Sequence, residues 1–133
     1  MPKSYFLDNA ILDHQLGGPD YVRPATVWIA LMTTAPTPAG GGVEVSGGSY
    51  VRVAVANNST NLPATSGSGL KSNGTTISFV TPTAGWGLVP FFAIYDASSG
   101  GNLLRYGNLT IPKTIDQGDI VTFPPGELDC TES

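Results

Sequence analysis

The chain has 133 residues, and only 12% of them are charged, whereas glycine and proline are frequent, with 17 and 11 residues. Globular domains usually have about 25% charged residues. With 41% hydrophobic residues the chain is too apolar to be wholly disordered. It also lacks the apolar run of about 18 residues that predicts a membrane span. The composition favours one small β-rich domain whose surface is made mainly of Thr, Ser, Asn and Gly.

The charges argue against nucleic-acid binding. The net charge is −4, and the six Lys and Arg residues are scattered along the chain, whereas phosphate contacts need clustered basic residues. Acids instead gather at residues 116–133, which contain no Lys or Arg. This segment is either a solvated tail or a segment that docks on a basic surface. Cys130 is the only cysteine, which excludes an intramolecular disulfide and a cysteine-based metal site.

The only predicted helix runs from Ser4 to Leu16. Ser4 can cap its first turn, apolar residues recur at helical spacing, and Gly17-Gly18-Pro19 ends it. A short helix is not stable alone, so it must lie on a sheet or on a neighbouring subunit. The helix therefore supplies candidate interface residues, namely Tyr5, Phe6, Leu7, Ile11 and His14.

Strands are predicted from residue 25 onward. Residues 27–33 are almost continuously apolar, which indicates a central strand covered on both faces. Residues 50–57 are rich in β-branched side chains and predict a second strand. Between and after these strands, the Gly-, Pro- and Ser-rich segments 35–49 and 58–73 are expected to be flexible loops.

The second half of the chain contains more predicted strands, over residues 75–80, 89–96, 102–111, 120–123 and 127–131. Trp86, which lies between two glycines, is expected at a corner where its indole is exposed. Together the pattern predicts an all-β fold, a β-sandwich or jelly roll of about seven or eight strands with one short N-terminal helix. Residues 1–133 are expected to form a single domain with an N-terminal arm and helix over 1–24.

The sequence contains little that indicates catalysis. No phosphate-binding glycine loop, dinucleotide fingerprint or zinc-protease helix is present. His14 is the only histidine, and its neighbour Asp13 lies on another face of the predicted helix. Asp96, Asp116 and Asp119 stand at predicted turns, where carboxylates commonly cap the backbone. We therefore expect no enzyme activity, no catalytic residues, no cofactor and no metal site.

The aromatic residues leave two interpretations open. They can line a sugar-binding face, or they can be core and interface anchors, which is the more usual role. The residues in question are Trp28, Trp86, Tyr5, Tyr21, Tyr50, Tyr95 and Tyr106.

Several motifs in a fixed order resemble a family of small virion structural proteins of tailed bacteriophages and prophages. They are VWIALMTTAP at 27–36, GGVEVSGGSYVRVAV at 41–55, KSNGTTISF at 71–79, GWGLVPFFAIYDA at 85–97, GGNLL at 100–104 and PKTIDQG at 112–118, with a helical segment such as 8–16 before them. The resemblance covers nearly the whole chain. Members are often labelled tail-fibre-like, and some resemble head decoration or cement proteins.

The resemblance implies a virion protein without catalytic residues, made in the cytoplasm of the host bacterium. Our leading hypothesis is a capsid decoration (cement) protein on the capsid surface that binds the major capsid protein as a dimer or trimer. The alternative is a tail-fibre or baseplate component that binds tail proteins or host glycans. Neither involves nucleic acid or a membrane. Besides the helix residues, the candidate partner interface includes Trp86, Asp129 and Glu132.

Overall fold

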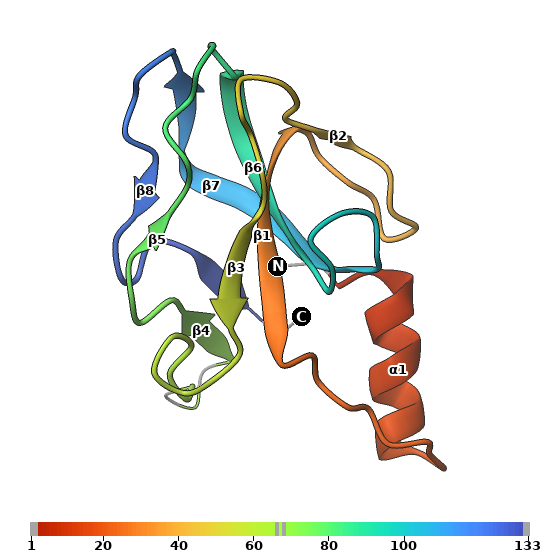
Figure 1. Ribbon diagram of the computed structural model, residues 1–133. Coiled ribbons are helices and arrows are strands. Elements are labelled where there is room, and N and C mark those ends of the chain that lie inside the picture. Colours follow the sequence, from red (N-terminus) through yellow and green to blue (C-terminus); the bar gives the residue numbers. More distant parts are fainter. Residues whose placement is uncertain (1–2, 66, 68, 132–133) are drawn as a thin grey trace.

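The computed structural model describes residues 3–65, 67 and 69–131 and contains one helix and nine strands within them (Figure 1). In chain order the elements are α1 (Tyr5–Gln15), β1 (Thr26–Thr34), β2 (Val43–Glu44), β3 (Val53–Ala56), β4 (Leu70–Ser72), β5 (Ile77–Ser78), β6 (Gly87–Tyr95), β7 (Leu103–Ile115), β8 (Thr122–Phe123) and β9 (Asp129–Thr131).

A five-stranded antiparallel sheet is the main layer of the fold. Four of its strands follow the order β2-β1-β6-β7. The fifth strand, β3, lies on the same side of β1 as β2 does: β3 pairs with the first half of β1, and β2 pairs with the second half of β1. Leu31 of β1 lies opposite Phe92 of β6, and both are buried. All four residues from Ile29 to Met32 are buried, so residues 27–33 do form a central strand that is covered on both faces.

β7 is bent in its middle. Phe91 of β6 pairs with Asn108, but Val89 pairs with Lys113, so β7 has extra residues at this point. Pro90 and Pro112 lie in the same region, and neither can donate a backbone hydrogen bond to the ladder. The extra residues form a bulge that redirects β7, so that its second half runs beside the start of β6 near β8 (Figure 1).

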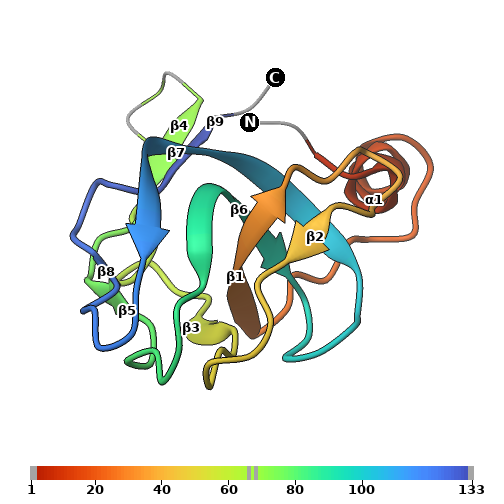
Figure 2. The ribbon, with the colours of Figure 1, turned by 90° about the horizontal axis from the view of Figure 1, so that it is seen from above.

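Two two-stranded ribbons complete the fold. β4 pairs with β9, and β5 pairs with β8. Both ribbons lie on the side of the molecule away from α1, as Figures 1 and 2 show from two directions. The predicted all-β class with one short helix is confirmed, in a sandwich-like arrangement of one sheet and two ribbons.

The larger part of the core lies between the sheet and the ribbons. Its buried residues range along the chain from Leu7 of α1 to Leu128 before β9. Phe123 of β8 has no exposed surface, and its ring meets that of Phe79 edge to face at 5.9 Å. A smaller cluster on the opposite face of the sheet contains Ala30, Met32, Ala93 and Leu103.

The segments expected to be loops contain short strands. Within 35–49, Thr37 and Gly40 exchange backbone hydrogen bonds in a tight turn, and β2 follows. Within 58–73, the Asn58 side chain accepts from the backbone of Thr60 and Asn61, and β4 comes later. The strand predicted over 50–57 is shorter than expected, because only β3 pairs with the sheet.

Candidate docking surface and hollow at helix α1

α1 begins where the prediction places it. The Ser4 hydroxyl accepts a hydrogen bond from the Leu7 N–H at 3.1 Å, as an N-cap residue does. The backbone N–H of Ser4 also donates to Leu104 of β7, and that of Tyr5 donates to Pro38. The start of the helix is therefore attached to the sheet and to the loop that precedes β2.

The two faces of α1 have different surroundings. Leu7 is buried, and Ile11, one turn later, packs against the same core. Tyr5 precedes Leu7 by two residues, which is about 200° around the helix, so it points away from the core. Leu12 lies seven residues after Tyr5 on that outward face, and the C-cap residue Leu16 is one turn further. We call Tyr5, Leu12 and Leu16 the outer stripe; their exposed fractions are 59%, 54% and 75%.

The helix residues predicted for the interface therefore separate into two groups. Tyr5 and Phe6 are exposed, as an interface requires. Leu7 is only 5% exposed, so the expectation that it contacts a partner is wrong, because the chain's own core takes up its surface. Ile11 is half-buried against that core.

His14 lies at the end of α1 and contacts the segment that follows. Its Nδ1 accepts a hydrogen bond from the Tyr21 N–H at 3.0 Å and lies 3.9 Å from an Asp20 carboxylate oxygen. The histidine ring thus holds the turn after the helix against the helix end.

Trp86 is buried, so the expected exposure of its indole is wrong. Only 6% of the residue is exposed. Its indole N–H donates to the Gly48 carbonyl at 3.1 Å, and a Cβ at Gly48 would lie 2.8 Å from the indole nitrogen. The flanking glycines suggested an open corner, but the turn at residues 47–49 folds over the ring. The Tyr50 ring packs on it edge to face at 5.3 Å.

Most of the acidic residues near the C-terminus have partners within the chain. Asp119 accepts from the backbone N–H of Asp116 in the predicted turn, and Glu127 pairs with Lys113 at 3.2 Å. Asp129, a predicted interface residue, is exposed on β9 and accepts a hydrogen bond from the Ser72 hydroxyl. Glu132 lies outside the described residues.

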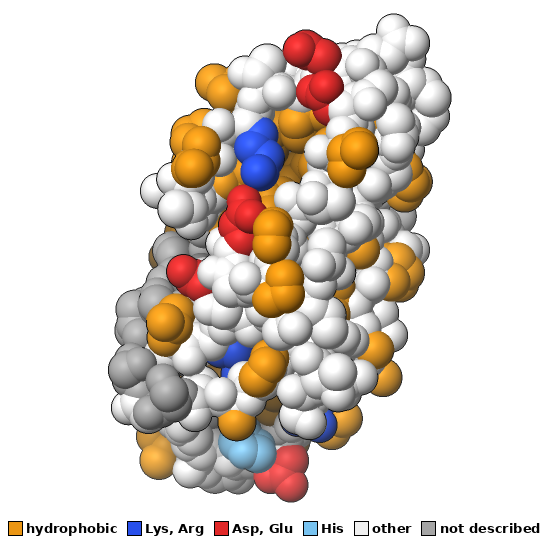
Figure 3. Space-filling model, turned by 90° about the vertical axis from the view of Figure 1, so that its left-hand side faces the viewer, with side chains coloured by type: hydrophobic (Ala, Val, Ile, Leu, Met, Phe, Trp, Pro, Cys, Tyr) orange, Lys and Arg blue, Asp and Glu red, His pale blue; other side chains and the backbone are white. Residues whose placement is uncertain are grey.

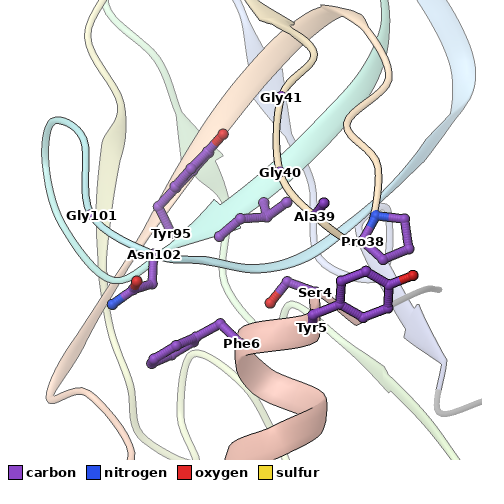
Figure 4. Close-up of a pocket in the computed structure, with 11 residues that line it drawn as sticks. Ser4, Tyr5, Phe6, Pro38, Ala39, Gly40, Gly41, Tyr95, Gly101 and Asn102 are labelled. Carbon is purple, nitrogen blue, oxygen red and sulfur yellow. The ribbon is translucent and has the colours of Figure 1, made fainter.

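A hollow of about 450 Å³ opens beside the start of α1 (Figure 4). It lies between the helix, the loop at residues 38–41 and the turn that joins β6 to β7. Tyr5 and Phe6 extend from the helix on either side of Ser4, and Tyr95 comes from the end of β6. None of the described residues that line the hollow is charged.

The wall that carries Tyr95 is held by a partly buried ion pair. Arg52 makes two hydrogen bonds to the Glu44 carboxylate, at 2.9 and 3.0 Å, and its side chain is only 7% exposed. The guanidinium lies 3.7 Å from the centre of the Tyr95 ring, within the range of a cation–π contact. Burial alone lowers the pKa of Arg52, but the hydrogen bonds and charge of Glu44 raise it above its ordinary value.

The turn between β6 and β7 is fixed from both ends. Arg52 donates to the carbonyls of Ala97 and Gly100, each at 2.9 Å. Asp96 accepts from both the backbone N–H and the side-chain amide of Asn102, at 2.7 and 3.0 Å. Asp96 is thus a turn-capping carboxylate, as its position in the sequence predicts.

The structure offers no other obvious site of chemistry in its described part. No group of three or more His, Cys, Asp or Glu side chains there could hold a metal ion. Within the same residues, no helix has the length and apolarity to span a membrane. Burial raises the pKa of the Cys130 thiol, which lowers its reactivity at neutral pH. On the face of the molecule that carries the ribbon of β5 and β8, apolar side chains are scattered and form no large patch (Figure 3).

Sequence reasoning missed several residues of these surfaces. Leu12 and Leu16 could have been found from their four-residue spacing and from the seven residues that separate Leu12 from Tyr5. The hollow has no local signal, because Phe6, Tyr95 and Asn102 come from segments about 90 residues apart in the chain, and only tertiary folding joins them.

A search of curated proteins finds no significant match. A family model described as "Podophage GP4 fiber I protein gp80" matches residues 2–131, which is nearly the whole chain. The match confirms the resemblance to tail-fibre-like virion structural proteins of phages. The chain therefore belongs to the gp80 family of podophage GP4 fiber I proteins.

Proposed function

We propose that this protein is a non-enzymatic component of the phage tail fibre that attaches to a larger tail protein through the outer stripe of α1. The observation that carries the proposal is this stripe. Its three apolar side chains are more than half exposed although α1 has its other face in the core. Membership of a fibre family supports a tail position.

Exposed apolar side chains in a row favour a docking role. Apolar surface removed from water stabilises a complex by about 25 cal/mol per Å², so a helix that lays such a row into a groove gains affinity. Single exposed apolar residues need no explanation, but an aligned row on one helix indicates a binding face. The tail component that binds it should therefore present an apolar groove.

The charges around the stripe indicate what surrounds that groove. Asp8, Asp13 and Asp20 lie on α1 or just after it, and the Asp20 side chain is 89% exposed. The Lys3 ammonium, which precedes the helix, lies 3.8 Å from an Asp8 carboxylate oxygen, and His14 is the only basic side chain in α1 itself. A partner groove with basic side chains at its rim would complement this surface, which affects association rate and specificity more than affinity.

Particle assembly tests the proposal. A phage that lacks the gene is complemented with tagged chain, either wild type or Leu12→Asp/Leu16→Asp, and purified particles are examined by immunogold electron microscopy. We expect the wild-type label on the tail. We expect the double variant to be lost from particles by roughly tenfold or more, because a buried charge without a partner costs several kcal/mol.

The matched control is Ile120→Asp, which introduces the same charge at an apolar residue that is 84% exposed and lies far from α1 in the sequence. It should be incorporated as the wild type is. Label spread over the head would contradict a tail position and support capsid decoration. A homodimer or homotrimer that the double variant dissociates would assign the stripe to contacts between copies of this chain.

A further inference from the structure

Three of the six Lys and Arg residues meet at one pocket, although they are far apart along the chain. Arg23 follows α1, Lys71 lies in β4 and Arg105 lies in β7. They line a pocket of about 230 Å³ between α1 and the ribbon of β4 and β9. None of the described residues that line it is an Asp or Glu. This basic pocket therefore concentrates positive charge in a chain whose net charge is −4.

The inner wall of the basic pocket is apolar. Its aliphatic lining residues belong to the main core or pack against it, and they are Leu7, Ile11, Val27, Leu62, Ile94 and Leu104. Arg23 is exposed and Lys71 is half-buried, so the pocket extends from the core to the surface. Positive charge thus surrounds an opening that is apolar inside.

Two of the basic side chains act on a group inside the pocket. Cys130 of β9 lines it, and burial raises the pKa of the thiol, whereas the charges of Arg105 and Lys71 act in the opposite direction. Both cations are therefore close enough to stabilise a negative charge at this place. The Lys71 Nζ donates to the Leu62 carbonyl at 3.2 Å, and an ammonium group has two further N–H donors for an anion.

We propose that the basic pocket takes an acidic segment of another virion protein, which inserts one large apolar side chain and places its carboxylates beside Arg23 and Lys71. The volume of about 230 Å³ is below the range of small-molecule sites, roughly 300–1,000 Å³, and suits a single side chain such as leucine or phenylalanine. The apolar side chain would supply most of the affinity, and the charges would supply specificity and a faster association.

The contact would be separate from attachment through the outer stripe and is tested separately, with purified full-length protein. Pentapeptides that carry two glutamates on each side of a central residue are titrated at low salt, and NMR shift changes give the affinity. A central leucine or phenylalanine should bind, with the largest shifts at the residues that line the basic pocket. A central alanine should bind about tenfold less tightly or worse, because it fills little of the apolar space.

Two variants test the role of charge. Arg23→Gln and Lys71→Gln should each weaken binding of the glutamate peptide by about two- to fivefold, as expected for ion pairs near the surface. Neither should change binding of a peptide in which glutamine replaces every glutamate, since that peptide has no charge to pair. Added salt should weaken binding of the glutamate peptide alone.

The matched control is Lys113→Gln, which removes the same charge at a residue that does not line the basic pocket and pairs with Glu127. It should bind the glutamate peptide as the wild type does, and far-UV circular dichroism confirms that each variant is folded. Absence of binding, equal binding of the alanine peptide, or equal losses for Lys113→Gln and the pocket variants would each overturn the proposal. Binding to anionic lipid vesicles without binding to the peptides would also overturn it and assign the basic pocket to a membrane surface.

Discussion

Tyr50 shows how a single side chain connects distant parts of the chain. Its hydroxyl accepts from the Leu31 N–H of β1 at 3.0 Å and donates to Glu44 at 2.7 Å, and Glu44 in turn holds Arg52. Its ring also packs on Trp86. Burial, followed by the hydrogen bond to Glu44, raises the pKa of Tyr50 well above its ordinary value.

Replacing Tyr50 by Phe should lower the free energy of unfolding at pH 7 by roughly 1–3 kcal/mol, because the Leu31 N–H loses its acceptor in a half-buried place. The raised pKa of Tyr50 also makes stability depend on pH. The neutral phenol stabilises the folded state fully below about pH 10, the ordinary pKa of tyrosine, and this contribution falls as the pH rises toward the folded-state pKa.

Urea unfolding of wild type and Tyr50→Phe between about pH 7 and about pH 11 measures both effects. The difference between the two proteins should shrink above about pH 10. Tyr5→Phe, at an exposed residue, serves as the control and should unfold as the wild type does at pH 7. A difference that stays constant with pH would show that Tyr50 titrates alike in the folded and unfolded states.

Asn73 illustrates how a sequence motif can mislead at this scale. Residues 73–75 form a glycosylation sequon. Yet Asn73 is 3% exposed, and its amide donates to three carbonyls, those of Thr75, Phe123 and Pro124. Its oxygen accepts from the Leu128 N–H at 3.0 Å. The side chain therefore joins the two ribbons and offers no surface to a modifying enzyme.

At the scale of elements, α1 depends on its cap and on its attachment to the sheet. Ser4 is 2% exposed, so water does not readily replace its hydroxyl as the acceptor for the Leu7 N–H. Ser4→Ala should therefore cost about 1 kcal/mol or somewhat more of unfolding free energy. Chemical denaturation measures the loss.

Two variants complete this experiment on the helix cap. Ser4→Thr keeps an oxygen at the cap and should restore most of the stability. Ser99→Ala, at an exposed residue in the β6–β7 turn, is the control for loss of a hydroxyl and should change little. If Ser4→Thr were as unstable as Ser4→Ala, packing and not capping would explain the role of Ser4.

At the scale of the whole molecule, one core connects the helix, the sheet and the ribbon of β5 and β8, and it extends to Leu128 just before β9. Phe123 is fully buried in it. Phe123→Ala should lower the free energy of unfolding by about 3–5 kcal/mol, because it removes a large apolar side chain and leaves a cavity. Since the core is continuous, we expect the wild type and the variant each to unfold in a single transition.

Coincident unfolding curves from far-UV circular dichroism and tryptophan fluorescence test that cooperativity. The fluorescence reports on Trp86 in the core and on Trp28 in β1, whereas circular dichroism reports on the strands. Ile120→Ala, at a residue that is 84% exposed, should change the stability by no more than about 0.5 kcal/mol. Separate transitions for the two signals would mean that the chain contains more than one folding unit.

The local elements followed from the sequence where local chemistry specifies them. Ser4 and the glycines after residue 16 delimit α1, and the long apolar run at 27–33 marks a central strand, because capping and burial on both faces leave direct sequence patterns. The two short strands β2 and β4 were not predicted, since they lie within the Gly-, Pro- and Ser-rich segments 35–49 and 58–73, whose composition indicates loops. The order of motifs along the chain was also sufficient to indicate a phage virion protein.

Tertiary structure alone decided which side chains are available to partners. Trp86 and Leu7 are buried because distant segments cover them, and the glycines beside Trp86 gave no sign of the turn at 47–49. The hollow exists only because the helix start, one loop and the β6–β7 turn meet in space. A sequence determines which side chains prefer burial, but the long-range contacts of the folded chain determine which of them remain exposed, and here they leave the outer stripe of α1 and the rim of the hollow.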